Sequence, residues 1–521
     1  MASGTEQAAL NREENGSDSD HLSKEPIAVP ALDWDGPTDP VTSPNTNVIE
    51  QSCSHRSQNN PRNFSTAKKV FITACLASLV CIATFGSSVM SPSSGQLIHE
   101  FGISKEVSVL ATALYVLGFA VGPLLFGPAS EVLGRKYPLS VGVFLFAIFS
   151  IPIAVAKNVA TIFVCRFFCG TFAAAPLAIV RFSTPTFRPS LRDILTPKPK
   201  AGGGLADLWE PLSRGIAVAG FASATFLGPV LGPLVGGFVT KSHLGWRWTQ
   251  WLSIIFSLVF LAIYFVFCPE TYSPVVIARL AKKRGHMPPG GKVDFKQLAR
   301  VYMLRPFIML VQEPILALLT LYMGFIYGFL YLCFEAFPIA FEEHRGWDIG
   351  IGSLPFLSIT VGVLIGVVII IVHTMTRMRR KLETVGDAPE ERLVPMMIGS
   401  IMMPAGIFWF AWTSNTSLPW APQVVSGVFI GCGILLIFLQ GMNYIIDVYK
   451  VMANSAISIN AMFRGLLGAG FPLFASYMFD NLGVSWAMSL LGFLCVALVP
   501  VPFLFFIYGE RIRKWSKFTA H

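Results

Sequence analysis

The sequence predicts an all-α membrane protein whose twelve transmembrane helices form two six-helix bundles. Three observations predict this fold class. Of the 521 residues, 53% are hydrophobic and 13% are charged, whereas soluble globular chains carry roughly 25% charged residues. Apolar stretches of about 20 residues, long enough to cross the hydrocarbon layer, recur along the chain. A polar, basic segment divides these stretches into two equal sets.

The chain begins with a tail, 1–67, that is expected to be disordered in the cytosol. It holds the polar runs REENGSDSD and GPTDPVTSPNTN and few aromatic side chains, so it cannot bury enough apolar surface to fold. No charged head and cleavage site precede the first span, which is therefore expected to act as an uncleaved insertion signal.

Twelve hydrophobic stretches follow, and each is predicted to cross the membrane as a helix. Six belong to an N-terminal bundle at 68–268 and six to a C-terminal bundle at 314–508. The predicted spans are 70–91, 107–127, 137–156, 158–180, 215–239, 249–268, 314–338, 351–372, 394–413, 420–441, 453–478 and 485–508.

The distribution of Lys and Arg predicts the orientation of these spans. Loops on the side of the N-terminus carry most of the cations, and such loops stay in the cytosol. Both termini are therefore expected to be cytosolic, in the plasma membrane, with the vacuolar membrane as the alternative. The Lys and Arg residues of these cytosolic loops account for the net charge of +9, which therefore does not indicate nucleic-acid binding. The opposite loops hold only Lys105, Lys157, Lys241, Arg247 and Arg345.

The loop between spans 2 and 3 reads GPASEVLGRKYPL and begins at Gly127. Glu131 precedes a turn at Gly134, and Arg135 and Lys136 follow the turn. A carboxylate and two cations placed in this way predict a charge-assisted latch, with topological retention by the cations alone as the alternative. The loop resembles the G-x-L-A-D-x-x-G-R-[RK] pattern of the major facilitator superfamily, with Glu131 in place of the family's Asp.

Span 4 contains one cation, Arg166, in the run CRFFCGTFAAAPLAIV. An intramembrane Arg is costly unless it faces a polar cavity or a partner. The run is similar to the R-x-x-x-G pattern of proton-coupled members of the superfamily, and the resemblance implies a role in coupling. The alternative is that Arg166 hydrogen-bonds to backbone carbonyls and braces the bundle.

The stretch RFSTPTFRPSLRDILTPKPKA, 181–201, departs from the family. Its four prolines prevent it from extending span 4, and its five basic residues predict a cytosolic location. Because it splits an otherwise matching block, it is interpreted as a translated intron or a gene-model error, and a genuine loop is the alternative. If expressed, the insertion predicts weakened packing of spans 4 and 5, and hence an inactive paralogue as one alternative function.

Span 5 carries small residues at every fourth position: Gly220, Ala224, Gly228, Gly232 and Gly236. This spacing places small surfaces along one ridge of a helix, where a neighbouring backbone can approach closely. Because four residues advance by about 400°, the ridge drifts around the helix, and its partner must cross obliquely. The sequence therefore predicts a close packing seam.

The same span reads G-P-x-x-G-P-x-x-G-G, with Pro229, Pro233 and Gly237 completing the pattern. Each proline leaves a carbonyl unpaired and permits a bend, which is tolerated where neighbours satisfy the freed group. This form resembles the fifth-helix signature of the antiporter branch of the superfamily.

Further blocks extend the resemblance from about residue 68 to the C-terminus. GWRWTQW, PETYSPVV, RPFIMLVQEP, FEAFPIAFEEHRGW and NYIIDVY resemble fungal drug:proton antiporters with twelve spans, of the polyamine and azole exporter type. The resemblance implies the major facilitator fold and proton-coupled efflux by alternating access. The alternative is a proton symporter or facilitator for a small nutrient with the same fold.

The second half begins with a basic, Pro/Gly-rich cytosolic loop at 269–313 and ends with a cytosolic tail at 509–521. Glu335, in the outer part of span 7, is the first candidate for the proton carrier because an acid partly removed from water is more easily protonated. Asp447, at the inner end of span 10, is the alternative carrier, although that position favours a gate or latch. Arg464 in span 11 is predicted to pair with Asp447 or to brace its bundle.

The expected partners are protons, the lipid bilayer and a small amphipathic or cationic substrate, with the chain acting as a monomer. No phosphate-binding loop, metal-spaced cluster or catalytic constellation occurs in the sequence, so neither a metal, nor a cofactor besides the proton gradient, nor an enzyme activity is predicted. Polar and aromatic side chains on the cavity helices are the predicted substrate contacts. They are Tyr115, Tyr327, Tyr331, Gln440, Asn443 and Asn460.

Overall fold

The computed structural model describes residues 64–179, 211–272, 275–276, 279, 303–385 and 389–516. All regular structure in these ranges is helical. Most of the predicted N-terminal tail, the stretch 181–201, much of the central loop and residues 517–521 lie outside them.

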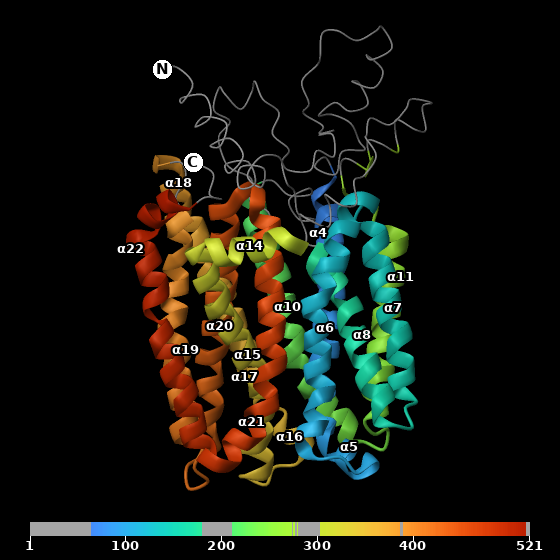
Figure 1. The fold of residues 1–521 in the computed structure, drawn as a ribbon. Coiled ribbons are helices and arrows are strands. Elements are labelled where there is room, and N and C mark those ends of the chain that lie inside the picture. Colours follow the sequence, from blue (N-terminus) through green and yellow to red (C-terminus); the bar gives the residue numbers. More distant parts are fainter. Residues whose placement is uncertain are drawn as a thin grey trace, which may run out of the picture.

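The helices form two bundles that stand side by side (Figure 1). The N-terminal bundle contains α4 (Thr66–Ser88), α5 (Ser94–Phe101), α6 (Lys105–Leu133), α7 (Lys136–Ala154), α8 (Val159–Ile179), α10 (Pro211–Lys241) and α11 (Arg247–Phe267). The C-terminal bundle contains α14 (Arg305–Gln312), α15 (Pro314–Pro338), α16 (Ile349–Gly352), α17 (Phe356–His373), α18 (Arg379–Val385), α19 (Leu393–Thr413), α20 (Trp420–Tyr449), α21 (Ala453–Leu498) and α22 (Pro500–Trp515).

The two ends of the molecule differ in the short helices that cover them (Figure 1). Helix α14 lies across one end, here called the α14 end, which is the predicted cytosolic side. Helices α5 and α16 lie at the opposite end, here called the α16 end. The bundles meet mainly along α6 with α21 and α10 with α17, and α10 also contacts α16.

The last two predicted spans are joined at Gly483. Eleven helical stretches are long and apolar enough to cross a membrane, and the last of them covers 61 residues, Ala453–Arg513. A straight helix of that length would measure about 90 Å, three times the hydrocarbon core of about 30 Å. At Gly483 the backbone leaves the helical region, with φ 70° and ψ 163°, and the chain returns toward the α14 end in α22 (Figure 1). The stretch therefore crosses twice, which confirms the predicted twelve-helix fold.

The small-residue ridge of α10 packs against α4, as the spacing predicts. A Cβ atom on Gly228 would overlap Thr84 Oγ1, one on Gly232 would overlap Ser88 Oγ, and one on Gly236 would overlap the carbonyl oxygen of Val89. At Gly220, by contrast, the added atom would meet nothing within 4 Å. The close seam is confirmed for the part of the ridge from 228 to 236, and it does not extend back to 220.

One of the two prolines of α10, Pro233, is accommodated by a hydroxyl from α4. Pro233 has no N–H to donate to the carbonyl oxygen of Pro229, one helical turn earlier. Ser88 Oγ donates a hydrogen bond to that oxygen at 2.6 Å. A neighbouring helix thus satisfies the freed backbone group, which is the condition under which proline is tolerated in a membrane helix.

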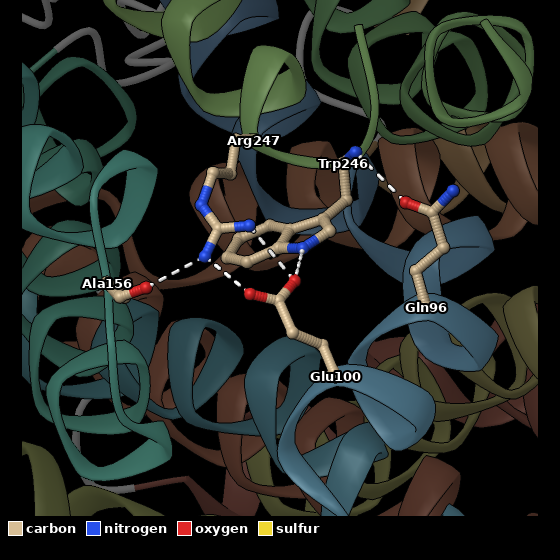
Figure 2. Close-up of polar contacts among 5 residues, drawn as sticks. All are labelled: Gln96, Glu100, Ala156, Trp246 and Arg247. Carbon is tan, nitrogen blue, oxygen red and sulfur yellow. Dashed lines mark hydrogen bonds and ion pairs between the residues drawn. The ribbon is translucent and has the colours of Figure 1, made fainter. Parts of the chain in front are cut away.

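The α16 end of the N-terminal bundle is held by a polar cluster around Glu100 (Figure 2). Arg247 binds both carboxylate oxygens of Glu100, at 3.0 and 2.6 Å, and also donates to the carbonyl of Ala156 at 2.9 Å. The indole of Trp246 donates to the same carboxylate at 2.8 Å, and its backbone N–H donates to Gln96. The start of α11 is thereby fixed to α5 and to the end of α7.

Candidate functional site

A cavity lies between the two bundles and takes residues from both. The space in it that water-sized molecules can occupy measures about 70 Å³. Helices α6, α8 and α10 line one side, and α15, α20 and α21 line the other. The lining residues are Phe119, Pro123, Ala174, Leu177, Ala178, Phe221, Thr225, Tyr327, Phe438, Met442, Ile457, Ser458, Ala461, Arg464 and Gly465.

The cavity lies in the half of the molecule nearest the α14 end. Two lining residues, Thr225 and Arg464, lie in the first halves of α10 and of the first α21 crossing, which begin at the α14 end. Two others, Pro123 and Met442, lie in the second halves of α6 and α20, which end there. All of these helix portions face the α14 end (Figure 1). The cavity therefore lies in the half of the molecule that the sequence predicts to be nearer the cytosol.

Arg464 is the one charged residue among the described residues that line the cavity. Its guanidinium carbon lies over two aromatic rings, 4.9 Å from the centroid of Tyr327 and 4.5 Å from that of Phe438. Its Nη1 atom is buried and has no hydrogen-bond partner in the described part of the chain. The predicted pairing with Asp447 is wrong, because the Asp447 carboxylate binds Arg392 instead, at 3.0 Å.

Arg166 has the opposite environment and braces the N-terminal bundle. It is fully buried, and its three guanidinium nitrogens donate to the backbone carbonyls of Ala111, Gly86 and Ser87 at 2.6, 2.7 and 2.9 Å. It also lies 4.5 Å from the ring centroid of Tyr115. The structure thus corresponds to the bracing alternative for Arg166, because carbonyls of α4 and α6 engage every nitrogen that coupling would need.

The predicted substrate contacts are divided between the cavity and the surrounding core. Tyr327 lines the cavity, whereas Tyr115 donates its hydroxyl to the carbonyl of Ala83 at 2.7 Å. Asn460 is buried against Thr320 within the C-terminal bundle, at 3.4 Å. Three further candidates are buried without lining the cavity, namely Tyr331, Gln440 and Asn443.

The α16 end is closed by contacts between the bundles. Lys105 at the start of α6 binds Glu343, the last residue of the turn Ile339–Glu343, at 2.7 Å. Lys241 at the end of α10 binds Asp348, the N-cap of α16, at 2.8 Å. A Cβ atom on Gly237 would overlap Ser353 Oγ, which shows how closely α10 approaches this segment. We call the two ion pairs the α16 gate.

The tyrosine cluster beneath this gate adds a third connection. Tyr331 of α15 and Ser87 of α4 share a hydrogen bond of 2.9 Å between their hydroxyls, and Tyr327 lies 3.4 Å from Tyr331. The cluster therefore adds a hydrogen bond between the bundles beside the cavity, which Tyr327 lines.

The Lys241–Asp348 pair is expected to stabilise this closure over the physiological pH range. The hydrogen bond from the Lys241 ammonium lowers the pKa of Asp348. A carboxylate with a lowered pKa loses its contribution only as the pH falls through that lowered value, and the ordinary Asp value is about 3.9. The pair is therefore expected to remain charged from about pH 5 to pH 7.

Neutralising this pair is expected to expose the α16 end. In a Ser353→Cys background, Asp348→Asn should speed reaction with a membrane-impermeant maleimide several-fold, because the closed state loses one of its ion pairs. The ratio of this rate to that of the Ser353→Cys background should not change between about pH 5 and pH 7, because the thiolate fraction that sets the maleimide rate rises equally in both proteins. Reversing both charges, Lys241→Asp with Asp348→Lys, should restore slow labelling. An unchanged rate in Asp348→Asn would remove this pair from the gate.

Glu335 lies near the α16 end of α15. Its side chain is 8% exposed, and no described residue donates a hydrogen bond to it. The charges that act on it are those of Lys105 and Glu343, which form one pair of the α16 gate. Glu342 is the other nearby acid. A proton that binds Glu335 therefore changes the charge directly beneath the gate.

The loop after α6 is held by a carboxylate that the latch prediction did not include. Glu270, just beyond α11, accepts hydrogen bonds from the backbone N–H groups of Arg135 and Lys136, each at 3.1 Å. Gly134 has φ 87°, and a Cβ atom there would lie 2.5 Å from Glu270 Oε2. The side chain of Glu131 lies outside the described residues. Arg135 also lies 5.2 Å from the ring centroid of Tyr272.

Removing the charge of Glu270 is expected to destabilise this loop. A carboxylate at the start of a helix contributes up to about 2 kcal/mol where it is partly buried, so Glu270→Gln should lower the thermal midpoint of the purified protein. Asp480→Asn, which neutralises an exposed carboxylate at the α16 end, should leave it unchanged. Equal midpoints for the two variants would contradict the role assigned to Glu270.

The functional contacts that sequence reasoning missed are made between helices distant in the chain. Glu270 lies within the block PETYSPVV and Arg247 within GWRWTQW, so the family blocks marked their positions without indicating their partners. Glu100 carried no signal of its own. Three aromatic residues that line the cavity could not be distinguished in the sequence from the rest of its 43 Phe residues, namely Phe119, Phe221 and Phe438.

Comparison with known proteins agrees with this architecture. Residues 76–194 and 199–471 match the Major Facilitator Superfamily. The chain is 89% identical to the MFS-type transporter traF of Penicillium crustosum over the full length of both proteins. It is 42% identical to the citrinin biosynthesis cluster MFS transporter mrr1 of Monascus ruber, over 98% of each chain.

The fold also resembles that of a solved transporter. The proton:xylose symporter XylE, bound to 6-bromo-6-deoxy-D-glucose, superposes with a TM-score of 0.59 over 85% of this chain and 96% of its own, at 15% sequence identity. Two helical bundles, a cavity lined by both and a family match over most of the length lead to one conclusion: the chain is a multi-pass membrane protein that belongs to the Major Facilitator Superfamily of transporters.

Proposed function

We propose that this protein exports an amphipathic secondary metabolite from the cytosol in exchange for protons, by alternating access. The observation that carries the proposal is the arrangement of one cavity and one closed end. Both bundles line the cavity in the half nearest the α14 end, and two ion pairs join the bundles at the α16 end. This is the geometry of a transporter whose cavity is available from the predicted cytosolic side.

The substrate class is supported by a relative. The protein mrr1 is named as the MFS transporter of a citrinin biosynthesis cluster, and this name supports a secondary metabolite as the substrate class. The G-P-x-x-G-P-x-x-G-G pattern of α10 supports antiport, and the wider resemblance supports the drug:proton antiporter branch. Plasma-membrane location follows from this proposal.

Proton coupling is proposed to act through Glu335. Binding of a proton from the outside neutralises Glu335 beside Lys105, Glu342 and Glu343 and favours closure of the α16 gate. Release of the proton to the cytosol accompanies the return. The gradient supplies about 1.4 kcal/mol per pH unit for one proton and about 2.3 kcal/mol per 100 mV for one charge. Substantial accumulation ratios therefore need no ATP.

The direction of transport tests the proposal. Everted membrane vesicles carrying the protein are incubated with an organic extract of the native host's culture, and the compounds they retain are identified by mass spectrometry. Export predicts that at least one metabolite accumulates when the lumen is acidic, and that collapse of the gradient prevents it. Accumulation only with an alkaline lumen would indicate a symporter, and retention equal to that of vesicles lacking the protein would contradict the proposal.

A further inference from the structure

The two intramembrane arginines described above differ in what satisfies them. All three nitrogens of Arg166 donate to backbone carbonyls at 2.6 to 2.9 Å. Arg464 makes no hydrogen bond or ion pair to any residue in the described ranges. The side chain of Arg464 is partly exposed, but its buried Nη1 atom has no partner among the described residues. A buried donor left unpaired is unfavourable, and bracing does not explain this cost.

Two aromatic rings and the cavity surround the guanidinium of Arg464. The rings of Tyr327 and Phe438 lie within 5 Å of the guanidinium carbon and attract its charge, as aromatic faces do. The donor N–H groups of a guanidinium lie in its plane, in a fork that matches a carboxylate. Because Arg464 lines the cavity, an acceptor entering the cavity can reach these donors.

The rest of the cavity is suited to an apolar body. Phe119, Phe221, Met442 and Ile457 line it, and no described lining residue is Asp or Glu. Apolar walls with a few placed polar groups are typical of sites for small organic ligands. A cation in this cavity would face the uncompensated charge of Arg464 with no carboxylate to balance it.

We infer that the cavity selects amphipathic anions, with the acidic group of the substrate paired to Arg464 and its ring system against the aromatic walls. This inference rests on the proposed export function and names its substrate class. Arg464 supplies the planar, charge-assisted contact. The acidic group of the substrate supplies the acceptor that no described residue provides. Polycations such as polyamines, which the sequence resemblance includes, are excluded as preferred substrates.

Two probes with the same ring and opposite charge test the inference. The full-length protein in nanodiscs is equilibrated by dialysis with 2-naphthoate or with 2-naphthylmethylammonium. We expect 2-naphthoate to bind at least 10-fold more tightly. Arg464→Gln should lose that preference by weakening 2-naphthoate at least 10-fold, without weakening the ammonium probe. Arg464→Lys keeps the positive charge but lacks the planar pair of donors, so its affinity for 2-naphthoate should fall between those of the unaltered protein and Arg464→Gln.

The controls separate recognition from folding and from net charge. Lys157→Gln removes an exposed cation far from the cavity and should bind both probes as the unaltered protein does. If Arg464→Gln fails to fold, the comparison of the two probes on the unaltered protein still decides. Equal or tighter binding of the ammonium probe, or unchanged 2-naphthoate affinity in a folded Arg464→Gln, would overturn the inference.

Binding at equilibrium needs no gradient, so this result is independent of the direction of transport. Selective binding of 2-naphthoate without proton-driven accumulation in everted vesicles would sustain the anion site and reject export. Proton-driven export of only compounds that lack an acidic group would support export and reject the anion site.

Discussion

Replacing Glu335 by glutamine is expected to reduce proton-driven accumulation in everted vesicles more than 10-fold while leaving equilibrium binding of 2-naphthoate unchanged. Glu335 is 8% exposed and receives no hydrogen bond from the described residues, and it lies beside the Lys105–Glu343 pair rather than in the cavity. Glutamine has nearly the same shape but cannot gain or lose a proton. Substrate binding and proton binding are thereby separated.

The matched control is Glu106→Gln, which neutralises an exposed carboxylate at the same end of the molecule. It should retain both accumulation and its dependence on pH. Full pH-driven accumulation in Glu335→Gln would exclude Glu335 as the proton carrier. Loss of accumulation together with loss of 2-naphthoate binding would indicate general damage to the fold instead.

Replacing Gly228 by alanine is expected to destabilise the protein markedly, although it adds one methyl group. The new Cβ atom would overlap Thr84 Oγ1 and the adjacent backbone carbonyl of Cys81 on α4. Overpacking of a close interface costs about 1–3 kcal/mol, and backbone atoms cannot relieve the overlap by changing rotamer. The thermal midpoint of the purified protein and its yield as a monodisperse species should both fall.

The control lies on the same helix and the same ridge. Gly220→Ala adds an identical methyl group where nothing lies within 4 Å, and alanine is favoured over glycine in a helix by about 1 kcal/mol. It should leave stability unchanged or raise it. If the two substitutions have equal effects, the α4–α10 seam does not depend on close backbone approach.

The sequence predicted the features that depend on a single helix. Span length, the i, i+4 spacing of Gly228, Gly232 and Gly236 and the two prolines of α10 are local patterns, and the structure confirms the seam that they imply. Even the need to satisfy a freed carbonyl was predictable, because proline removes a donor wherever it stands. The donor itself, Ser88, was not.

The features that depend on how helices face each other were not predictable. Hydropathy fixes the position of a residue along the membrane normal but not the neighbour that it meets. Arg166 and Arg464 both read as single cations in apolar runs, yet one is saturated by carbonyls and the other opens on the cavity. The partners of Arg135, Asp447 and Arg247 come from segments distant in the chain.

The most direct test of proton-coupled exchange is the sign of the pH change in the lumen when 2-naphthoate enters. Proteoliposomes containing the protein and a trapped pH-sensitive dye are mixed with 2-naphthoate at equal internal and external pH. Passive entry of the neutral acid acidifies the lumen, whereas exchange of the anion for protons makes the lumen alkaline. Proton-coupled exchange predicts a rapid alkaline shift that is absent in Glu335→Gln. Acidification no different from that of protein-free liposomes would contradict proton-coupled exchange.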